Sequence, residues 1–146
     1  MALEDLVQQK EYTGAGYAPV IDYGAWRVAV LNHHPELNPE NICALHCHDQ
    51  TDEVFVLLRG HCLLYIGETD PARPEHTVAI HCIDMQPGRI YNVRRGVWHS
   101  HTPSVDASVL LVENRDTDST NTRERTLTAE QRGTIVDFSG VRRTRP

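Results

Sequence analysis

Short β-rich runs separated by turn signals are the feature of this sequence that most constrains its fold. Turn signals recur about every eight to twelve residues, and each run between them has the length of one strand. This spacing favours a sandwich or barrel over alternating βαβ units. The expected strands are residues 26–31, 42–48, 53–58, 61–66, 77–83, 90–93, 97–101 and 107–113.

Residues outside these strands are expected to form loops and short helical turns. Residues 67–75 contain Pro71 and Pro74, which favour a loop. Residues 114–125 are polar and charged, and they are expected to cross the surface. Residues 3–10 are expected to form a short helix near the N-terminal end.

The C-terminal part of the chain contains a second helical signal. Residues 128–132 are expected to form one or two helical turns, with Thr126 or Thr128 as the N-cap. Gly133 follows and is expected to end the helix. Residues 135–138 are apolar enough either to pack back onto the domain or to add an edge strand.

Length, charge and hydropathy narrow the class of protein. A chain of 146 residues, 40% hydrophobic and 23% charged, is expected to form one domain with a buried core. The net charge of -6 disfavours a nucleic-acid partner. No apolar stretch reaches the ~18 residues of a membrane span. The N-terminal residues lack the apolar core of a signal peptide, so a cytoplasmic protein is expected.

Three histidines and one glutamate are candidates for a single metal site. His46 and His48 are two residues apart on an expected strand, so their side chains point to the same face. Glu53 begins the next strand, and His99 lies far downstream. Imidazole and carboxylate ligands suit first-row transition metals better than calcium or magnesium.

A sulfur-containing zinc site is the alternative, because Cys43 and Cys47 flank His46. Strand alternation turns Cys47 away from whatever His46 binds. Cys62 and Cys82 lie in apolar runs and are expected to be small buried hydrophobic residues. No Cys-x-x-Cys pair is present, and disulfides are not expected in a reducing compartment.

The first candidate segment resembles a motif of the cupin superfamily, commonly written G-x5-H-x-H-x3,4-E-x6-G. His46, His48, Glu53 and Gly60 fit it, with four residues between the second histidine and the glutamate. The leading glycine is absent, because Glu40 occupies its position.

The second segment resembles the other cupin motif, commonly written G-x5-P-x-G-x2-H-x3-N. Gly88, Gly96 and His99 fit this motif. Arg94 replaces its proline and Pro103 replaces its asparagine, and neither position is a metal ligand in the family. The chain is also similar to small one-domain cupins of unassigned function.

This resemblance implies an all-β fold, a double-stranded β-helix or jelly-roll barrel with short terminal helical segments. The barrel core is expected at roughly residues 24–114, with an N-terminal segment 1–23 and a C-terminal extension 115–146. The implied metal ligands are His46, His48, Glu53 and His99, holding divalent iron, manganese, nickel or zinc with open positions. The resemblance also implies a homodimer, formed by strand exchange or by packing of sheet faces, with residues 1–23 suited to that contact.

Two residues are acid–base candidates beside this site. His101 follows His99 by two residues, so alternation points it into the same cavity. It is interpreted as a proton shuttle or substrate contact, or else as a histidine hydrogen-bonded at the barrel mouth. Tyr91 is the second acid–base candidate.

Three further residues are candidates for substrate binding. Arg94 precedes a turn, where an arginine either clamps a carboxylate or phosphate or is simply solvated. Tyr65 either places its hydroxyl in the cavity or belongs to the core. Phe55 shares the face of Glu53 and is expected to line the apolar wall of the pocket. Trp98 is expected to face the opposite layer.

These observations favour an enzyme of the oxygenase, isomerase or lyase type, acting on a small polar molecule at a metal centre. One alternative is a non-catalytic small-ligand or sugar-binding module with a structural metal. Another is a docking or accessory protein that binds through its outer sheet face. Because one fold serves many reactions, the fold alone does not decide among them.

Overall fold

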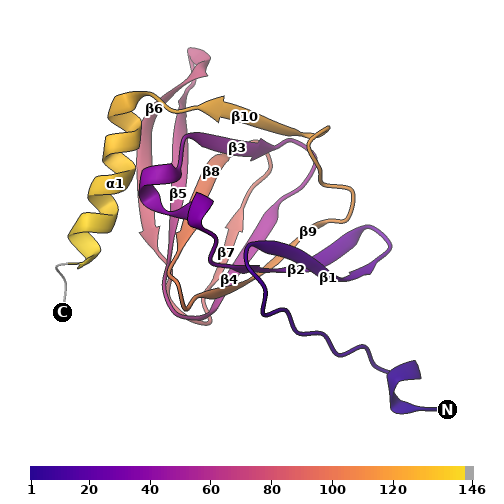
Figure 1. Cartoon of the computed structure of the whole chain (residues 1–146). Helices are drawn as coiled ribbons and strands as arrows, with labels where there is room; N and C mark the ends of the chain where they lie inside the picture. The colour runs from indigo at the N-terminus through magenta and orange to yellow at the C-terminus, as the bar shows by residue number, and fades with distance from the viewer. Residues whose placement is uncertain (144–146) are drawn as a thin grey trace.

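The chain folds into two antiparallel five-stranded sheets that curl around a shared interior, with one helix at the C-terminal end (Figure 1). The computed structural model describes residues 1–143. The first sheet has the strand order β1-β2-β9-β4-β7, and the second sheet has the order β10-β3-β8-β5-β6. In chain order the elements are η1 Leu3–Asp5, β1 Tyr17–Tyr23, β2 Trp26–Asn32, η2 Pro35–Leu37, η3 Pro39–Asn41, β3 Ala44–His48, β4 Glu53–Arg59, β5 Cys62–Asp70, β6 Arg73–Asp84, β7 Ile90–Val93, β8 Trp98–Pro103, β9 Ser108–Asn114, β10 Thr122–Thr126 and α1 Ala129–Arg143.

The all-β barrel expected from the sequence is therefore confirmed. Every expected strand is present, and its ends shift by only a few residues. The short helix expected near the N-terminal end is a single 3-10 turn, Leu3–Asp5. Beyond it the N-terminal segment runs extended and away from the barrel in Figure 1.

Residues 67–75 do not form the expected loop. β5 continues to Asp70 and β6 begins at Arg73, so Pro71 lies in a tight hairpin turn between two long strands. Pro74 lies inside β6, which is an edge strand of the second sheet. Proline is tolerated at an edge because its missing N–H need not donate to a neighbouring strand.

Two strands lie outside the range 24–114, one on each side of it. β1 pairs with β2 at the edge of the first sheet, and β10 pairs with β3 at the edge of the second. β10 overturns the expectation that residues 114–125 only cross the surface. Its sequence, Thr-Arg-Glu-Arg-Thr, has no apolar residue, so hydrophobic periodicity could not reveal it.

α1 is longer than the one or two turns expected. Thr128 caps it as predicted, since its backbone N–H and hydroxyl exchange hydrogen bonds with Gln131. The helix then passes through Gly133 because Ile135 and Phe138 pack against the second sheet. This packing outweighs the cost of about 1 kcal/mol for glycine in a helix. Within residues 1–143, no helix is long and apolar enough to cross a lipid bilayer.

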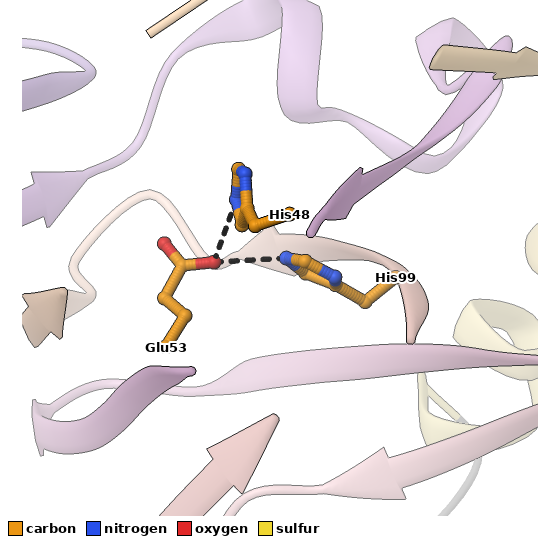
Figure 2. Close-up of side chains that lie close together, drawn as sticks. All are labelled: His48, Glu53 and His99. Atoms are coloured by element: carbon orange, nitrogen blue, oxygen red, sulfur yellow. Dashed lines mark hydrogen bonds and ion pairs between the residues drawn. The ribbon is translucent and has the colours of Figure 1, made fainter. Parts of the chain in front are cut away.

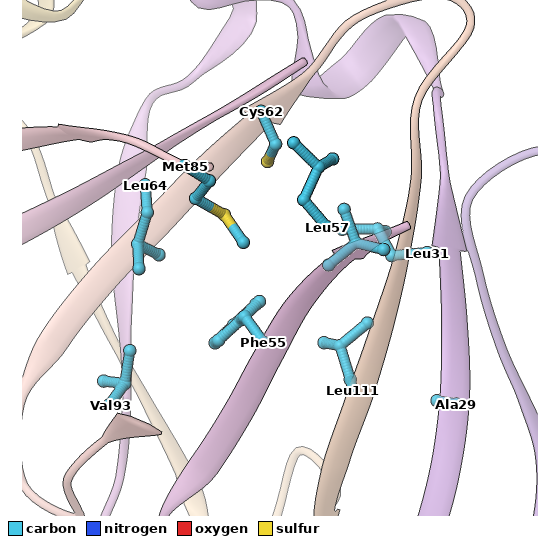
Figure 3. Close-up of a cluster of buried hydrophobic side chains, with 10 residues drawn as sticks. Ala29, Leu31, Phe55, Leu57, Cys62, Leu64, Met85, Val93 and Leu111 are labelled. Carbon is cyan, nitrogen blue, oxygen red and sulfur yellow. The ribbon is translucent and has the colours of Figure 1, made fainter. Parts of the chain in front are cut away.

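Strand alternation divides the buried side chains into two layers. The inner layer lies between the sheets and is almost entirely apolar (Figure 3): Ala29, Leu31, Phe55, Leu57, Cys62, Leu64, Met85, Val93, Val109 and Leu111. The outer layer lies between the second sheet and α1: Ile42, Leu45, Cys47, Leu63, Tyr65, Trp98, Leu127 and Ile135. The expectations that Trp98 faces the opposite layer and that Cys62 is a small buried hydrophobic residue are confirmed.

Two glycines of the sequence motifs allow turns that position the site. Gly60 has a φ of 69°, and a Cβ there would lie 2.6 Å from the Cα of Ala107. Any other side chain would therefore clash with the backbone. Gly96 has a φ of 81°, and its N–H donates to the carbonyl of His48 at 2.7 Å. That bond ties the turn before β8 to the end of β3.

Candidate metal centre

Three of the four expected ligands meet at one end of the barrel interior. His48 ends β3, Glu53 begins β4, and His99 lies at the start of β8. Glu53 Oε2 lies 2.8 Å from His99 Nε2 and 3.2 Å from His48 Nε2 (Figure 2). The ligand atoms of the three residues all lie within 4.8 Å of one another. One ion between them could therefore contact all three.

The hydrogen bonds of His99 are compatible with a cation in this group. His99 Nδ1 lies 3.0 Å from the carbonyl of Val97, and a carbonyl can only accept, so Nδ1 carries the hydrogen. In a neutral imidazole the lone pair is then on Nε2, which faces a carboxylate oxygen of Glu53. Two lone pairs at 2.8 Å repel each other unless a proton or a metal ion lies between them. The donor set thus fits a transition metal.

His48 is oriented in a similar way from the other side. Its Nδ1 lies 2.8 Å from the hydroxyl of Thr122 on β10, which leaves Nε2 directed at Glu53. The hydrogen bond to Glu53 raises the pKa of His48 above its usual value, although burial works against it. A histidine whose second nitrogen is held in this way presents a fixed nitrogen to a metal.

Glu53 is buried, yet it stays ionised. Burial alone would raise the pKa of Glu53, but hydrogen bonds and charges from His48 and His99 together lower it below its usual value. A buried carboxylate with basic partners is a strong ligand for a divalent ion. It is also costly to leave without a cation, because a buried charge needs compensation.

His46 lies close to this group but outside it. It is directly opposite His99 in the pairing of β3 with β8, and it lines the cavity next to Glu53. Burial lowers the pKa of His46, and the charge of Glu124 opposes that effect. The role of His46 as a fourth ligand remains a prediction.

A cavity of about 970 Å³ opens beside Glu53. This volume is at the upper end of the range of small-molecule sites. Its wall combines polar and apolar residues of the barrel with the η2–η3 segment: Ala15, Gly16, Tyr17, Leu31, His34, Pro35, Glu36, Leu37, Asn41, Ile42, Cys43, Ala44, His46, Glu53, Ser100, His101, Leu111 and Glu124.

His101 lines this cavity, as alternation from His99 predicts. The residue is half-buried, and its Nδ1 is fully buried with no hydrogen-bond partner in the part of the chain that the structure describes. Burial lowers the pKa of His101 to about 4, so its imidazole is neutral at pH 7. Its ring packs against Phe55, with the ring centroids 5.6 Å apart.

The other candidates from the sequence lie elsewhere. Phe55 is fully buried and supports the rings of His99 and His101 from the apolar side, without lining the cavity. Tyr65 belongs to the outer layer, where its hydroxyl donates to Thr102 and its ring stacks on Phe138.

Tyr91 and Arg94 also do not line the cavity. The hydroxyl of Tyr91 accepts a hydrogen bond from the backbone N–H of Gln86 at 2.8 Å. Arg94 is exposed in the turn between β7 and β8. The structure therefore brings together His48, Glu53, His99 and His101, but it does not bring these two residues to them.

Cys47 faces away from the metal centre, as expected. It is buried in the outer layer, where Arg123 Nη2 lies 3.4 Å from its sulfur. Its thiol lies 3.6 Å from Asp49 Oδ1. A zinc site that includes this sulfur together with His48 and His99 is excluded by the fold.

One polar residue of the barrel interior was not predicted from the sequence. Glu113 on β9 is buried and faces the interior, where its Oε1 accepts hydrogen bonds from Tyr17 and Arg27. The charges of Glu113 and Arg27 act on His48 with opposite signs. Alternation with Leu111 gives the inward direction of Glu113, but its partner Tyr17 comes from β1, which the sequence did not reveal.

Comparisons with known proteins agree with this architecture. No protein-family model and no curated protein matches the sequence. Among solved structures, Pac13 from Streptomyces, a nucleoside dehydratase solved with uridine, is similar over 84% of this chain and 88% of its own, with 9% identity and a TM-score of 0.54. A cupin-2 domain protein from Shewanella frigidimarina is similar over 79% of this chain and 94% of its own, with 19% identity and a TM-score of 0.46. Two curled antiparallel sheets around an interior site, together with this similarity, show that the chain has the cupin β-barrel fold.

Proposed function

We propose that this chain is a metal-dependent enzyme that acts on a small polar molecule in the cavity beside Glu53. The observation that carries the proposal is the contact between Glu53 and His99, where a buried carboxylate oxygen lies 2.8 Å from Nε2 of a ring whose Nδ1 donates to Val97. Glu53 also lines the cavity, so an ion held there would be reached by a ligand. A metal centre that is open on one side is typical of catalysis, whereas structural sites are closed.

The proposed ligands are His48, Glu53 and His99, with His46 as the fourth. Three imidazoles and one carboxylate suit divalent iron, manganese, nickel or zinc. When bound, such an ion supplies Lewis acidity toward an oxygen of the ligand. The chain itself orients two imidazoles through Val97 and Thr122 and keeps Glu53 ionised.

His101 is the proposed acid–base residue. Its side chain lines the cavity, and burial lowers its pKa to about 4, so the imidazole is neutral at pH 7. A neutral imidazole with a free lone pair can accept a hydrogen bond or a proton from a bound molecule. The ring of Phe55 packs against the ring of His101.

Oxygenase, isomerase and lyase chemistry all use a metal with this ligand set. Among these we place lyase chemistry first, because the nucleoside dehydratase Pac13 has the same fold over most of its length. That similarity is one of fold, at 9% identity, so lyase chemistry is the first reaction to assay, and the similarity names no substrate.

Elemental analysis of the protein purified without added metal tests the proposal. We expect close to one equivalent of a transition metal in the natural sequence and almost none in His99→Ala. His61→Ala is the control, because His61 is exposed and does not line the cavity. Metal content that is unchanged by His99→Ala would show that the site is wrong. Full metal loading with no turnover of any cavity ligand would instead favour the non-catalytic binding module.

A further inference from the structure

The wall of the cavity carries negative charge and hydrogen-bond acceptors. Glu53, Glu124 and Glu36 line it, and no lysine or arginine does so among the side chains that the structure describes. Glu124 lies opposite His46 in the pairing of β10 with β3, and its charge acts on that histidine. A divalent ion at the centre would be balanced by Glu53 and Glu124 together. The cavity therefore has no surplus positive charge to hold an acidic ligand.

Arg27 is a half-buried arginine beside Tyr17, and its donors are already in use. Its Nε and Nη2 donate to Glu113 Oε1 at 3.2 Å and 2.8 Å. Its remaining contacts go to the carbonyls of Arg115 and Thr117 at 3.1 Å and 2.8 Å. Four of the five N–H groups of a guanidinium are thus used. Arg27 cannot clamp a carboxylate or phosphate without breaking these bonds.

Tyr17 is the residue that this cluster holds against the cavity. Its hydroxyl donates to Glu113 Oε1 at 2.5 Å, and its ring lies 5.5 Å from the guanidinium carbon of Arg27. Burial and the contact with Glu113 raise the pKa of Tyr17, so its hydroxyl stays protonated at neutral pH. Because its hydrogen is given to Glu113, the phenolic oxygen has only lone pairs left for a ligand.

We propose that the cavity selects an uncharged or cationic ligand that presents hydroxyl or amine hydrogens, and that Tyr17 positions this ligand by accepting one of them. The inference rests on the proposed function for the location of the ligand and goes beyond it in naming the ligand's chemistry. Glu124 is a second acceptor on the same wall. Carboxylates and phosphates are rejected because they bring acceptors and negative charge to a wall that already has both.

A purely structural role for the cluster makes a different prediction. Tyr17, Arg27 and Glu113 join β1, β2 and β9, so they could serve only to fasten β1 to the sheet. In that case removing the hydroxyl of Tyr17 would lower the melting temperature and leave ligand selectivity unchanged. If Tyr17 positions a ligand, the same change alters affinity at saturating metal in protein that remains folded.

The test is a binding panel measured by calorimetry on the metal-loaded protein. The uncharged and cationic probes are uridine, ribose, glycerol and ethanolamine, and the acidic probes are uridine monophosphate, glycolate and oxalate. We expect at least one uncharged or cationic probe to bind and every acidic probe to bind at least tenfold more weakly. Tighter binding of an acid, or no binding by any uncharged or cationic probe, overturns the inference.

Tyr17→Phe removes only the phenolic oxygen and keeps the ring beside Arg27. We expect it to weaken the best probe by about tenfold, the loss of one hydrogen bond. Tyr23→Phe is the matched control, because Tyr23 is on the same strand and is 76% exposed. Equal affinities in both variants would assign Tyr17 to the structural role.

The outcomes separate the two proposals. If metal is bound but an acid binds best, the ligand class is wrong and the metal-dependent function stands. If no metal is bound, the proposed function fails, while the same panel on the metal-free protein still reports the preference of the cavity wall. Glu124→Lys adds a cation to that wall, and we expect it to shift preference toward the acidic probes.

Discussion

Glu53 Oε2 lies 2.8 Å from His99 Nε2, while the other nitrogen of that ring donates to the carbonyl of Val97. The imidazole therefore cannot donate to the carboxylate unless it carries a second proton. A metal ion removes this conflict, and so does protonation of the ring. Glu53 and His99 come from the two sequence motifs, and both are buried. The buried charge of Glu53 needs a compensating cation, which a metal ion or a protonated ring would supply.

Substituting Glu53→Gln is predicted to separate metal binding from folding. The glutamine amide can donate its own hydrogen to the lone pair on His99 Nε2, so the metal-free variant is expected to be at least as stable as the natural protein. Its metal affinity is expected to fall more than tenfold, because the charged ligand is lost. Chelator competition with Co²⁺ and thermal melting in excess chelator measure the two effects. Unchanged metal affinity would contradict the proposed ligand role.

Thr122 is predicted to matter for metal affinity although it is not a ligand. Its hydroxyl lies 2.8 Å from His48 Nδ1 and fixes the direction of that ring. We expect Thr122→Val to weaken metal binding by roughly 10-fold or more, as is usual when such an outer contact is lost. Thr126→Val, on the same strand but exposed, is the control. Equal Co²⁺ affinities in the two variants would argue that His48 is oriented by other contacts.

His101 is predicted to make the metal-free protein less stable as pH falls from about 6.5 toward 5. Burial lowers the pKa of His101 to about 4, against about 6.5 in an unfolded chain. In this window the unfolded state binds a proton that the folded state does not, so the free energy of unfolding decreases. The full shift corresponds to about 3 kcal/mol, reached only near the folded-state pKa.

Denaturant melts of His101→Gln across this pH range test that prediction. The slope of stability against pH is expected to flatten relative to the natural protein, whereas His61→Gln, an exposed histidine, keeps it. His46 contributes part of the remaining slope, because burial lowers its pKa as well. Identical slopes in the two variants would show that His101 is solvated in the folded protein.

The parts of the site that strand periodicity governs could be predicted from the sequence. His48, Glu53 and His99 lie on strands whose alternation is regular, and their spacing matched a known motif. Alternation also placed Cys47 and Trp98 in the outer layer. The prediction did not extend to Tyr65, because either face of β5 is apolar and the pattern alone does not say which one lines the cavity.

Contacts made by edge strands could not be predicted. β10 is entirely polar, and it pairs Thr122 with His48 across 74 residues of chain. β1 carries Tyr17 to Glu113 across 96 residues. Backbone hydrogen bonds and buried polar partners hold both strands, and neither leaves a periodic apolar signal. The identity of the metal and a cytoplasmic location remain predictions.

The outer face of the first sheet leads to the last prediction, which concerns self-association. Three neighbouring strands present a continuous aliphatic surface there, made of Val28, Val30, Val54, Val56, Leu110 and Val112, all half-buried. α1 covers only the other sheet (Figure 1). Soluble chains rarely leave such a face uncovered, so we expect a homodimer formed through it, with twice the 16.5 kDa mass of one chain.

Sedimentation velocity of Val112→Lys tests this expectation. A lysine at the centre of the face would bury an unpaired charge in the dimer, so the variant is expected to sediment as a monomer at concentrations where the natural protein is dimeric. Val78→Lys is the matched control, because Val78 is exposed on β6 of the second sheet. Removing residues 1–12 tests whether the extended N-terminal segment also contributes to the dimer, since Leu3 and Leu6 are exposed there. A monomer in the natural protein, or a dimer that survives Val112→Lys, would show that this face is not the interface.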